Sequence, residues 1–227
     1  MLKKLTSLLF GGTCFLCRGA AQDILCSACH ADLPRLPAAL CPRCALESPG
    51  GAVCGRCLAS PPQYDATIAV LSYAFPADAL VLALKFRGEF ALAPFFADLL
   101  SQRIVFEHAI DCVVPVPLST KRLRERGYNQ AAEIARPLAR AARVGLDLSV
   151  CERQRDTPAQ IDLPWAERER NVRGAFVSSR LLAGASIAVV DDVMTTGATL
   201  DEIAATLKRA GAKRVVNWVV ARTFPPN

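Results

Sequence analysis

The sequence predicts an α/β protein with a parallel sheet flanked by helices, preceded by a small cysteine-rich region that binds metal. Eight of the ten cysteines form Cys-x-x-Cys pairs within residues 14–57. After these pairs, apolar strand patterns alternate with helical patterns, as in parallel α/β sheets. The 227 residues, of which 52% are hydrophobic, suffice for one medium domain with an appendage or for two small domains.

The four Cys-x-x-Cys pairs are typical of structural zinc sites. Two thiolates at this spacing can bind one ion, and two such pairs complete a tetrahedral shell of four sulfurs. A disulfide framework is disfavoured because we recognise no secretory signal, and a thioredoxin-like redox motif is disfavoured because the pair occurs four times. We therefore expect about two structural Zn²⁺ ions. The expected ligands are Cys14, Cys17, Cys26, Cys29, Cys41, Cys44, Cys54 and Cys57.

The pairs can share the two ions in different ways. A consecutive arrangement combines the first pair with the second and the third with the fourth, whereas a crossed arrangement combines the first with the third. We favour the consecutive arrangement because it closes shorter loops. His30, next to Cys29, is a possible substitute ligand, but four sulfurs already complete a shell.

The second region begins after Ser60-Pro61-Pro62, where the composition changes. We therefore expect two domains, at residues 1–62 and 63–227. Strands are expected over 67–74, 111–116, 186–190 and 214–220, and helices over 77–86, 90–103, 129–143 and 199–210.

Two of the expected helices carry specific signals. In helix 199–210, Leu200, Ile203 and Leu207 recur at helical spacing, so that one apolar stripe packs on the sheet, and Gly211 ends the helix. Helix 129–143 contains Pro137, where a kink is expected.

No segment has the length of a membrane span. The apolar run at 5–10, after two lysines, is also too short and too polar for the core of a signal peptide. We therefore expect a cytoplasmic protein without membrane insertion. Its formal charge of +6 falls to about +2 if eight thiolates bind two Zn²⁺ ions, so net charge is weak support for nucleic-acid binding.

The segment 187–200, IAVVDDVMTTGATL, is the most informative in the chain. A buried strand delivers Asp191 and Asp192 to its carboxyl end, and a Thr- and Gly-rich turn leads directly into a helix. Backbone N–H groups, hydroxyls and the helix N-terminus can bind a phosphate there. Carboxylates beside a phosphate need a partner such as a ribose diol or Mg²⁺. The motifs of a P-loop and of a dinucleotide-binding fold are absent from the sequence.

The same segment resembles the phosphoribosyl pyrophosphate (PRPP) motif of type I phosphoribosyltransferases. Segments 84–89 (LKFRGE), 114–131 and 157–176, together with the cysteine pairs, resemble the ComF/GntX family of bacterial proteins. That family is associated with DNA uptake and with the use of DNA as a nutrient. The resemblance covers nearly the whole chain and implies a double zinc-ribbon module followed by a type I phosphoribosyltransferase-like domain.

The resemblance also implies roles for individual residues. Asp191 and Asp192, the expected catalytic residues, would hold the ribose 2′- and 3′-hydroxyls. Lys121 and Arg122 would bind the pyrophosphate, and Mg²⁺ would accompany PRPP. The expected 5′-phosphate site comprises Thr195, Thr196, Gly197, Ala198 and Thr199. The stretch 155–173 would form the flexible hood. The candidate hood residues and DNA contacts are Arg124, Arg126, Arg155, Arg168 and Arg173.

Two functional classes are compatible with this sequence. In one, the protein binds PRPP or a nucleoside 5′-phosphate and transfers phosphoribose to a base derived from imported DNA. In the other, it is a non-catalytic protein whose zinc module and arginine patches grip single-stranded DNA during uptake, with Tyr128 and Trp165 available for stacking. Other DNA-uptake proteins are candidate partners. A glutamine-dependent transferase is disfavoured because Met1-Leu2-Lys3 offers no nucleophilic cysteine.

Overall fold

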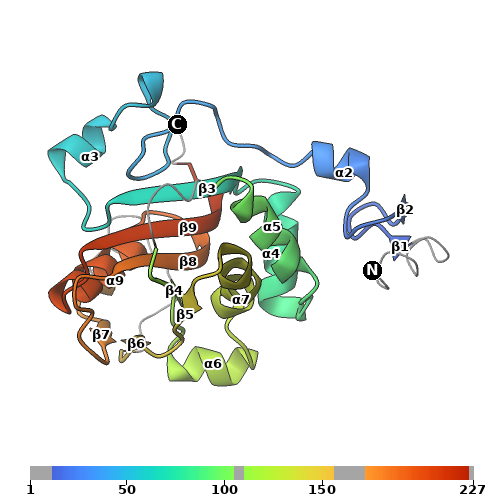
Figure 1. Cartoon of the computed structure of the whole chain (residues 1–227). Coiled ribbons are helices and arrows are strands. Elements are labelled where there is room, and N and C mark those ends of the chain that lie inside the picture. The colour runs from blue at the N-terminus through green and yellow to red at the C-terminus, as the bar shows by residue number, and fades with distance from the viewer. Residues whose placement is uncertain (1–11, 105–109, 156–171, 225–227) are drawn as a thin grey trace.

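A central parallel sheet of five strands organises the chain (Figure 1). The computed structural model describes residues 12–104, 110–155 and 172–224. The sheet order is β3-β9-β8-β4-β5, and every neighbouring pair is parallel, which confirms the predicted fold class. The strands are β3 (Ala66–Ser72), β4 (Cys112–Pro115), β5 (Gly145–Leu146), β8 (Ser186–Met194) and β9 (Arg214–Arg222).

Helices cover both faces of the sheet. Successive side chains of a strand point to opposite faces, and β8 shows this alternation. Ile187 and Val189 belong to the same buried cluster as the apolar stripe of α9 (Ala198–Arg209). Ala188 and Val190 belong to the cluster on the other face. The helices of that second face are α4 (Ala77–Arg87), α5 (Leu92–Ser101) and α7 (Gln130–Ala142).

The expected long elements are all present, with shifted ends. The strand expected at 186–190 continues to Met194, so Asp191 and Asp192 lie within β8. Pro137 lies inside α7, which is assigned as one helix from Gln130 to Ala142.

Four short elements were not expected from the sequence, namely α6 (Thr120–Arg126), β5, β6 (Cys151–Arg153) and β7 (Phe176–Ser178). The three strands have only two or three residues each, too few for a periodic signal. α6 has seven residues with no buried side chain, so an apolar stripe does not mark it.

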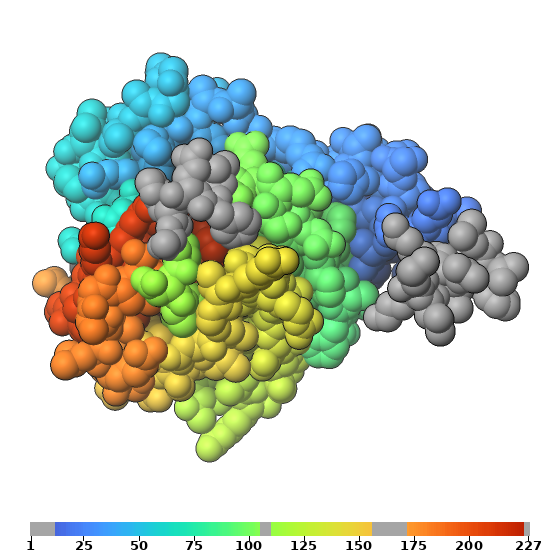
Figure 2. All heavy atoms as spheres, in the orientation of Figure 1, coloured from blue at the N-terminus to red at the C-terminus, as the bar shows by residue number. Residues whose placement is uncertain are grey.

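The cysteine-rich part lies on the α/β body in two places (Figures 1 and 2). Its regular elements are β1 (Gly12–Thr13), β2 (Ala20–Ala21), α2 (Ser27–Ala31), η1 (Pro49–Gly51) and α3 (Gly55–Ala59). The chain between α2 and η1 follows the edge strand β3, where Ser72 N donates to Pro34 O (2.7 Å) and Thr67 N to Pro42 O (3.0 Å). This segment therefore covers backbone groups that an edge strand would otherwise expose.

The helices are short. The longest of those described, α7, has 13 residues, whereas a membrane span needs about 20 apolar residues. Within residues 12–104, 110–155 and 172–224, the structure has no helix that is long and apolar enough to cross a membrane.

Candidate functional site

The expected phosphate-binding turn joins β8 to α9 in the middle of the sheet. We call residues 195–197 the β8–α9 loop. Gly197 precedes the first residue of α9 and has φ +89°, a left-handed conformation that glycine adopts without strain. Thr196 Oγ1 accepts a hydrogen bond from Ala198 N (3.1 Å). The loop therefore leads directly into the N-terminus of a 12-residue helix, whose backbone dipole favours an anion.

Asp191 and Asp192 are both buried near the carboxyl end of β8. They are neighbours in the strand, and their carboxyl groups come within hydrogen-bond reach of each other at its end. Asp191 Oδ1 accepts from the backbone N–H of Asp192 (2.9 Å). Burial, and next the charge of Asp192, raise the pKa of Asp191 well above its usual value. A hydroxyl donor or a cation bound here would stabilise the ionised form of Asp191.

Lys85 of α4 is the counter-ion of Asp192, with Nζ 3.0 Å from Oδ2. Burial alone would lower the pKa of Lys85, but the Asp192 carboxylate outweighs it, so that this pKa is raised. Among the described residues, no donor makes a well-directed hydrogen bond to Asp192 Oδ2. The ion pair with Lys85 therefore provides the compensation for the negative charge of this carboxylate. This role of Lys85 was not expected from the sequence, although Lys85 belongs to the segment LKFRGE that carries part of the family resemblance.

Lys121 and Arg122 lie in the first turn of α6. α6 follows β4, the neighbour of β8 in the sheet, so both residues follow the same carboxyl edge as the β8–α9 loop. Ser119 caps the helix by accepting from Arg122 N (3.4 Å). The first turn of α6 is therefore capped and carries two basic residues, and it directly follows the loop 116–119.

The other candidate arginines occupy two parts of the structure. Arg124 and Arg126 are in α6, where the Arg126 guanidinium lies 5.1 Å from the centre of the Phe86 ring. Arg155 and Arg173 are brought together, since Arg155 Nη2 donates to Arg173 O (2.7 Å). Arg168 and most of the expected hood lie outside the described residues.

Tyr128, a candidate for base stacking, has a structural role. Its hydroxyl donates to Leu84 O and accepts from Gly88 N (3.2 Å), and its ring packs edge-on against Phe90. Trp165, the other candidate, lies outside the described residues.

The eight expected zinc ligands form two groups of four. The first Cys cluster comprises Cys14, Cys17, Cys26 and Cys29, and the second comprises Cys41, Cys44, Cys54 and Cys57. Within each cluster all sulfurs lie within 4.8 Å of one another, so the cysteines are grouped as in the consecutive arrangement.

The sulfur geometry fits zinc. The distances between Cys17 and Cys26 sulfurs (3.7 Å) and between Cys44 and Cys54 sulfurs (3.6 Å) match the edge of about 3.8 Å in a tetrahedron with Zn–S bonds of about 2.3 Å. Hydrogen bonds from backbone N–H groups, first that of Cys17, lower the pKa of Cys14 to about 6 and favour the thiolate that a metal requires. Within the same cluster, the neighbouring Cys26 sulfur and burial raise the pKa of Cys29 to about 12.

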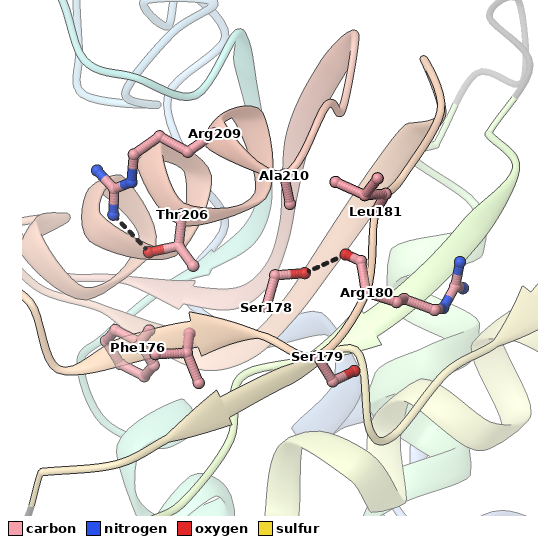
Figure 3. A pocket seen from close by; sticks show the side chains of 9 residues that line it. Phe176, Ser178, Ser179, Arg180, Leu181, Thr206, Arg209 and Ala210 are labelled. Atoms are coloured by element: carbon pink, nitrogen blue, oxygen red, sulfur yellow. Dashed lines mark hydrogen bonds between the residues drawn. The ribbon is translucent and has the colours of Figure 1, made fainter.

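A separate open pocket lies at the far end of α9 (Figure 3). β7, the segment after it and the last turn of α9 line this pocket, which contains Arg180 and Arg209. Arg180 pairs with Asp147 (2.9 Å) and Arg209 with Glu202 (3.5 Å), so carboxylates already compensate both charges. α9 is about 18 Å long, and the β8–α9 loop lies at its other end. This pocket is therefore not part of the candidate site.

Comparison with known proteins agrees with this two-part arrangement. Residues 5–58 match the family model of the double zinc ribbon domain, and residues 123–223 match that of the phosphoribosyl transferase domain. The DNA utilization protein YhgH of Salmonella typhimurium is 36% identical over 94% of this chain and 98% of that protein. Competence protein F of Haemophilus influenzae is 31% identical over the same shares. Competence protein ComFC of Streptococcus pneumoniae is 28% identical over 88% of this chain and 89% of that protein.

Proposed function

Because the chain belongs to the ComF family of DNA utilization and competence proteins, we propose that its β8–α9 loop binds the 5′-phosphate of PRPP or of a nucleoside 5′-phosphate. The observation that carries this proposal is the junction of β8 and α9. Two buried carboxylates precede a left-handed glycine and a helix N-terminus at the carboxyl edge of a parallel sheet. Ligands of open α/β sheets bind at this edge.

Different residues around the junction would bind different parts of the ligand. Asp191 and Asp192 would accept hydrogen bonds from the ribose hydroxyls, with Lys85 fixing the position of Asp192. The segment 195–199 would hold the 5′-phosphate, and Lys121 and Arg122 would pair with the diphosphate. Carboxylate and phosphate oxygens are the ligands that Mg²⁺ prefers. When bound with PRPP, this ion would neutralise charge on the pyrophosphate.

Held in this way, PRPP is positioned for displacement at the ribose C1. The bond from C1 to the pyrophosphate oxygen breaks, and a nitrogen of a heterocyclic base forms the new bond with its own electron pair. Lys121 and Arg122 stabilise the charge of the departing pyrophosphate. The test is to supply the purified protein with PRPP, Mg²⁺ and a panel of bases and to measure the pyrophosphate released. Release of pyrophosphate would indicate transfer of phosphoribose, whereas binding of PRPP without release would indicate binding alone.

Zinc thiolates persist in a reducing compartment, so we propose that the protein acts in the cytoplasm. Its family association suggests the proteins of DNA uptake as partners.

We expect PRPP with Mg²⁺ to raise the melting temperature of the protein, because a ligand that binds only the folded state stabilises it. The gain is about 2.7 kcal/mol at a hundredfold excess over the dissociation constant. Ribose 5-phosphate should have a smaller effect, since it lacks the diphosphate. Differential scanning fluorimetry and isothermal titration calorimetry measure both.

Asp191→Asn together with Asp192→Asn should weaken binding about tenfold or more, because the amides keep the size of the carboxylates but not their charge. Asp111→Asn is the matched control, since Asp111 lies beside the opposite end of β8, where Oδ2 accepts from Ser186 N (2.8 Å). Absence of any shift with millimolar PRPP, ribose 5-phosphate or nucleoside monophosphate would exclude the proposed phosphate site.

A second candidate function is binding of single-stranded DNA near α6. Phe86 of α4 is 67% exposed, and Arg126 lies against its ring. An exposed aromatic ring beside cations can stack on a base while the cations meet the phosphates.

Replacing Arg122, Arg124 and Arg126 together by Ala should then weaken binding and reduce the salt slope by about two to three. Fluorescence anisotropy with a labelled oligonucleotide between 50 and 200 mM salt, about the range over which such slopes are resolved, measures this. Arg136 and Arg140 of α7 and the residue that caps its C-terminus, Arg143, are all exposed. Changed together to Ala, they form a control of equal charge. Equal slopes for both triple variants would exclude α6 as the DNA surface.

A further inference from the structure

We propose that the second Cys cluster, through Arg56 and Arg222, holds the β8–α9 loop in the conformation that presents its N–H groups to a phosphate. We call these two arginines, with Cys41, Cys44, Cys54 and Cys57, the loop brace. The proposal rests on the proposed function and extends it, because it makes the two arginines positioning residues and couples one metal site to ligand binding.

Arg222 connects the second Cys cluster to the loop. It ends β9, opposite Met194 of β8, and is fully buried. Its Nε donates to Cys44 O (2.9 Å), while Nη1 donates to Met194 O (2.9 Å) and to Thr195 O. One guanidinium therefore contacts both a residue of the metal cluster and the start of the loop.

Arg56 adds the third contact. It lies in α3, between the cluster cysteines Cys54 and Cys57, and its Nη2 donates to Thr196 O (2.7 Å). The carbonyl groups of residues 194, 195 and 196 thus all accept hydrogen bonds from guanidinium groups of the loop brace.

Peptide geometry then determines where the N–H groups point. In a trans peptide, the C=O of one residue and the N–H of the next point in opposite directions. Since carbonyls 194–196 point to the loop brace, the N–H groups of Thr195, Thr196 and Gly197 point away from it. Successive N–H groups turned to one side form a concave anion site, and the N-terminus of α9 lies next to them.

Charge and packing keep this arrangement in place. Four thiolates around one Zn²⁺ ion carry a net negative charge, and this charge can compensate the buried guanidinium of Arg222 beside Cys44. Tyr64, also buried, lies beneath the loop, where its hydroxyl is 3.0 Å from the position of a Cβ on Gly197. Gln63 N donates to Asp201 of α9 (2.5 Å). The chain leaving the second Cys cluster therefore packs on both the loop and the helix that follows it.

The first Cys cluster has a different environment. His30, next to Cys29, packs edge-on against Phe95 of α5 at 6.2 Å between ring centres. Cys14 belongs to the buried cluster formed by α4, α5 and α7. Loss of the second metal site should therefore affect the loop, whereas loss of the first should not. The first Cys cluster thus serves as an internal control.

The first arm of the test compares Arg56→Gln with Arg43→Gln in full-length protein. Both variants remove one positive charge from the same cysteine-rich segment, but only the first removes the donor to Thr196 O. We define loop exchange as amide hydrogen exchange at Ala198 and Asp201, whose N–H groups donate to Thr196 Oγ1 and Gly197 O. We expect Arg56→Gln to speed loop exchange and to weaken PRPP binding, each about tenfold, and Arg43→Gln to change neither. Wild-type exchange and affinity in Arg56→Gln would overturn the proposal.

The second arm compares Cys54→Ser with Cys17→Ser, each of which should remove one zinc ion. Only Cys54→Ser should speed exchange in the loop. Equal effects of the two cysteine variants would show a general loss of stability and overturn the coupling. The exchange measurement needs no ligand, so the two proposals can fail separately. Failure of the wild-type protein to bind PRPP would exclude the proposed function. Faster loop exchange in Arg56→Gln and Cys54→Ser would still support the loop brace.

Discussion

Cys41→Ser should lower the zinc content from about two ions per chain to about one and unfold the second Cys cluster. Cys41 is fully buried, and Cys54 N donates to its sulfur (3.3 Å). Because metal binding supplies folding free energy to such a site, the free energy of unfolding should fall by about 4 kcal/mol or more. The parallel sheet should persist, since its two faces are covered by helices.

Elemental analysis, chemical denaturation and circular dichroism measure these three effects. Cys112→Ser is the control, because Cys112 is a thiol outside both clusters. Two zinc ions retained in Cys41→Ser would show that Cys41 is not a ligand. A wild-type protein purified without chelator and found free of zinc would exclude the structural metal sites altogether.

Gly197→Ala should abolish measurable PRPP binding and destabilise the fold. With φ at +89°, any side chain is strained at this position, and a Cβ would lie 2.7 Å from Met194 Cε and 3.0 Å from the Tyr64 hydroxyl. Both neighbours are buried, so the Met194 side chain must change its conformation within the core to make room. Backbone strain and overpacking together should cost about 2–4 kcal/mol, measured by urea unfolding.

Gly184→Ala distinguishes backbone strain from overpacking as the cause of the destabilisation. Gly184 has a similar φ of +80°, but a Cβ there would meet no atom within 4 Å, so only the backbone cost of about 1 kcal/mol remains. Equal destabilisation of both variants would contradict the packing explanation. The Cβ at position 197 would point at Met194 and Tyr64, on the protein side of the loop. The loss of PRPP binding would therefore come from the shift of the loop backbone that accommodates the Cβ, and not from a direct clash with the phosphate.

The sequence by itself determined those features that depend on local spacing. A buried strand, a Thr- and Gly-rich turn and an amphipathic helix were predicted at 186–210 because hydrophobic period and glycine placement are local signals. The zinc ligands were predicted for the same reason, since the spacing of Cys-x-x-Cys suits one ion. Very short elements such as β5 and β6 were missed because two or three residues carry no period.

Only the tertiary structure decided which distant side chains meet. Lys85 reaches Asp192 because α4 packs on the face of the sheet toward which Asp192 points. Arg56 reaches Thr196 across 140 positions of sequence, and Arg222 reaches Cys44 across 178. No local pattern marks these pairs, because each depends on how the second Cys cluster packs against the end of the sheet. The loop residues were readable from their own segment, whereas the arginines that orient the loop carbonyls required the packed fold.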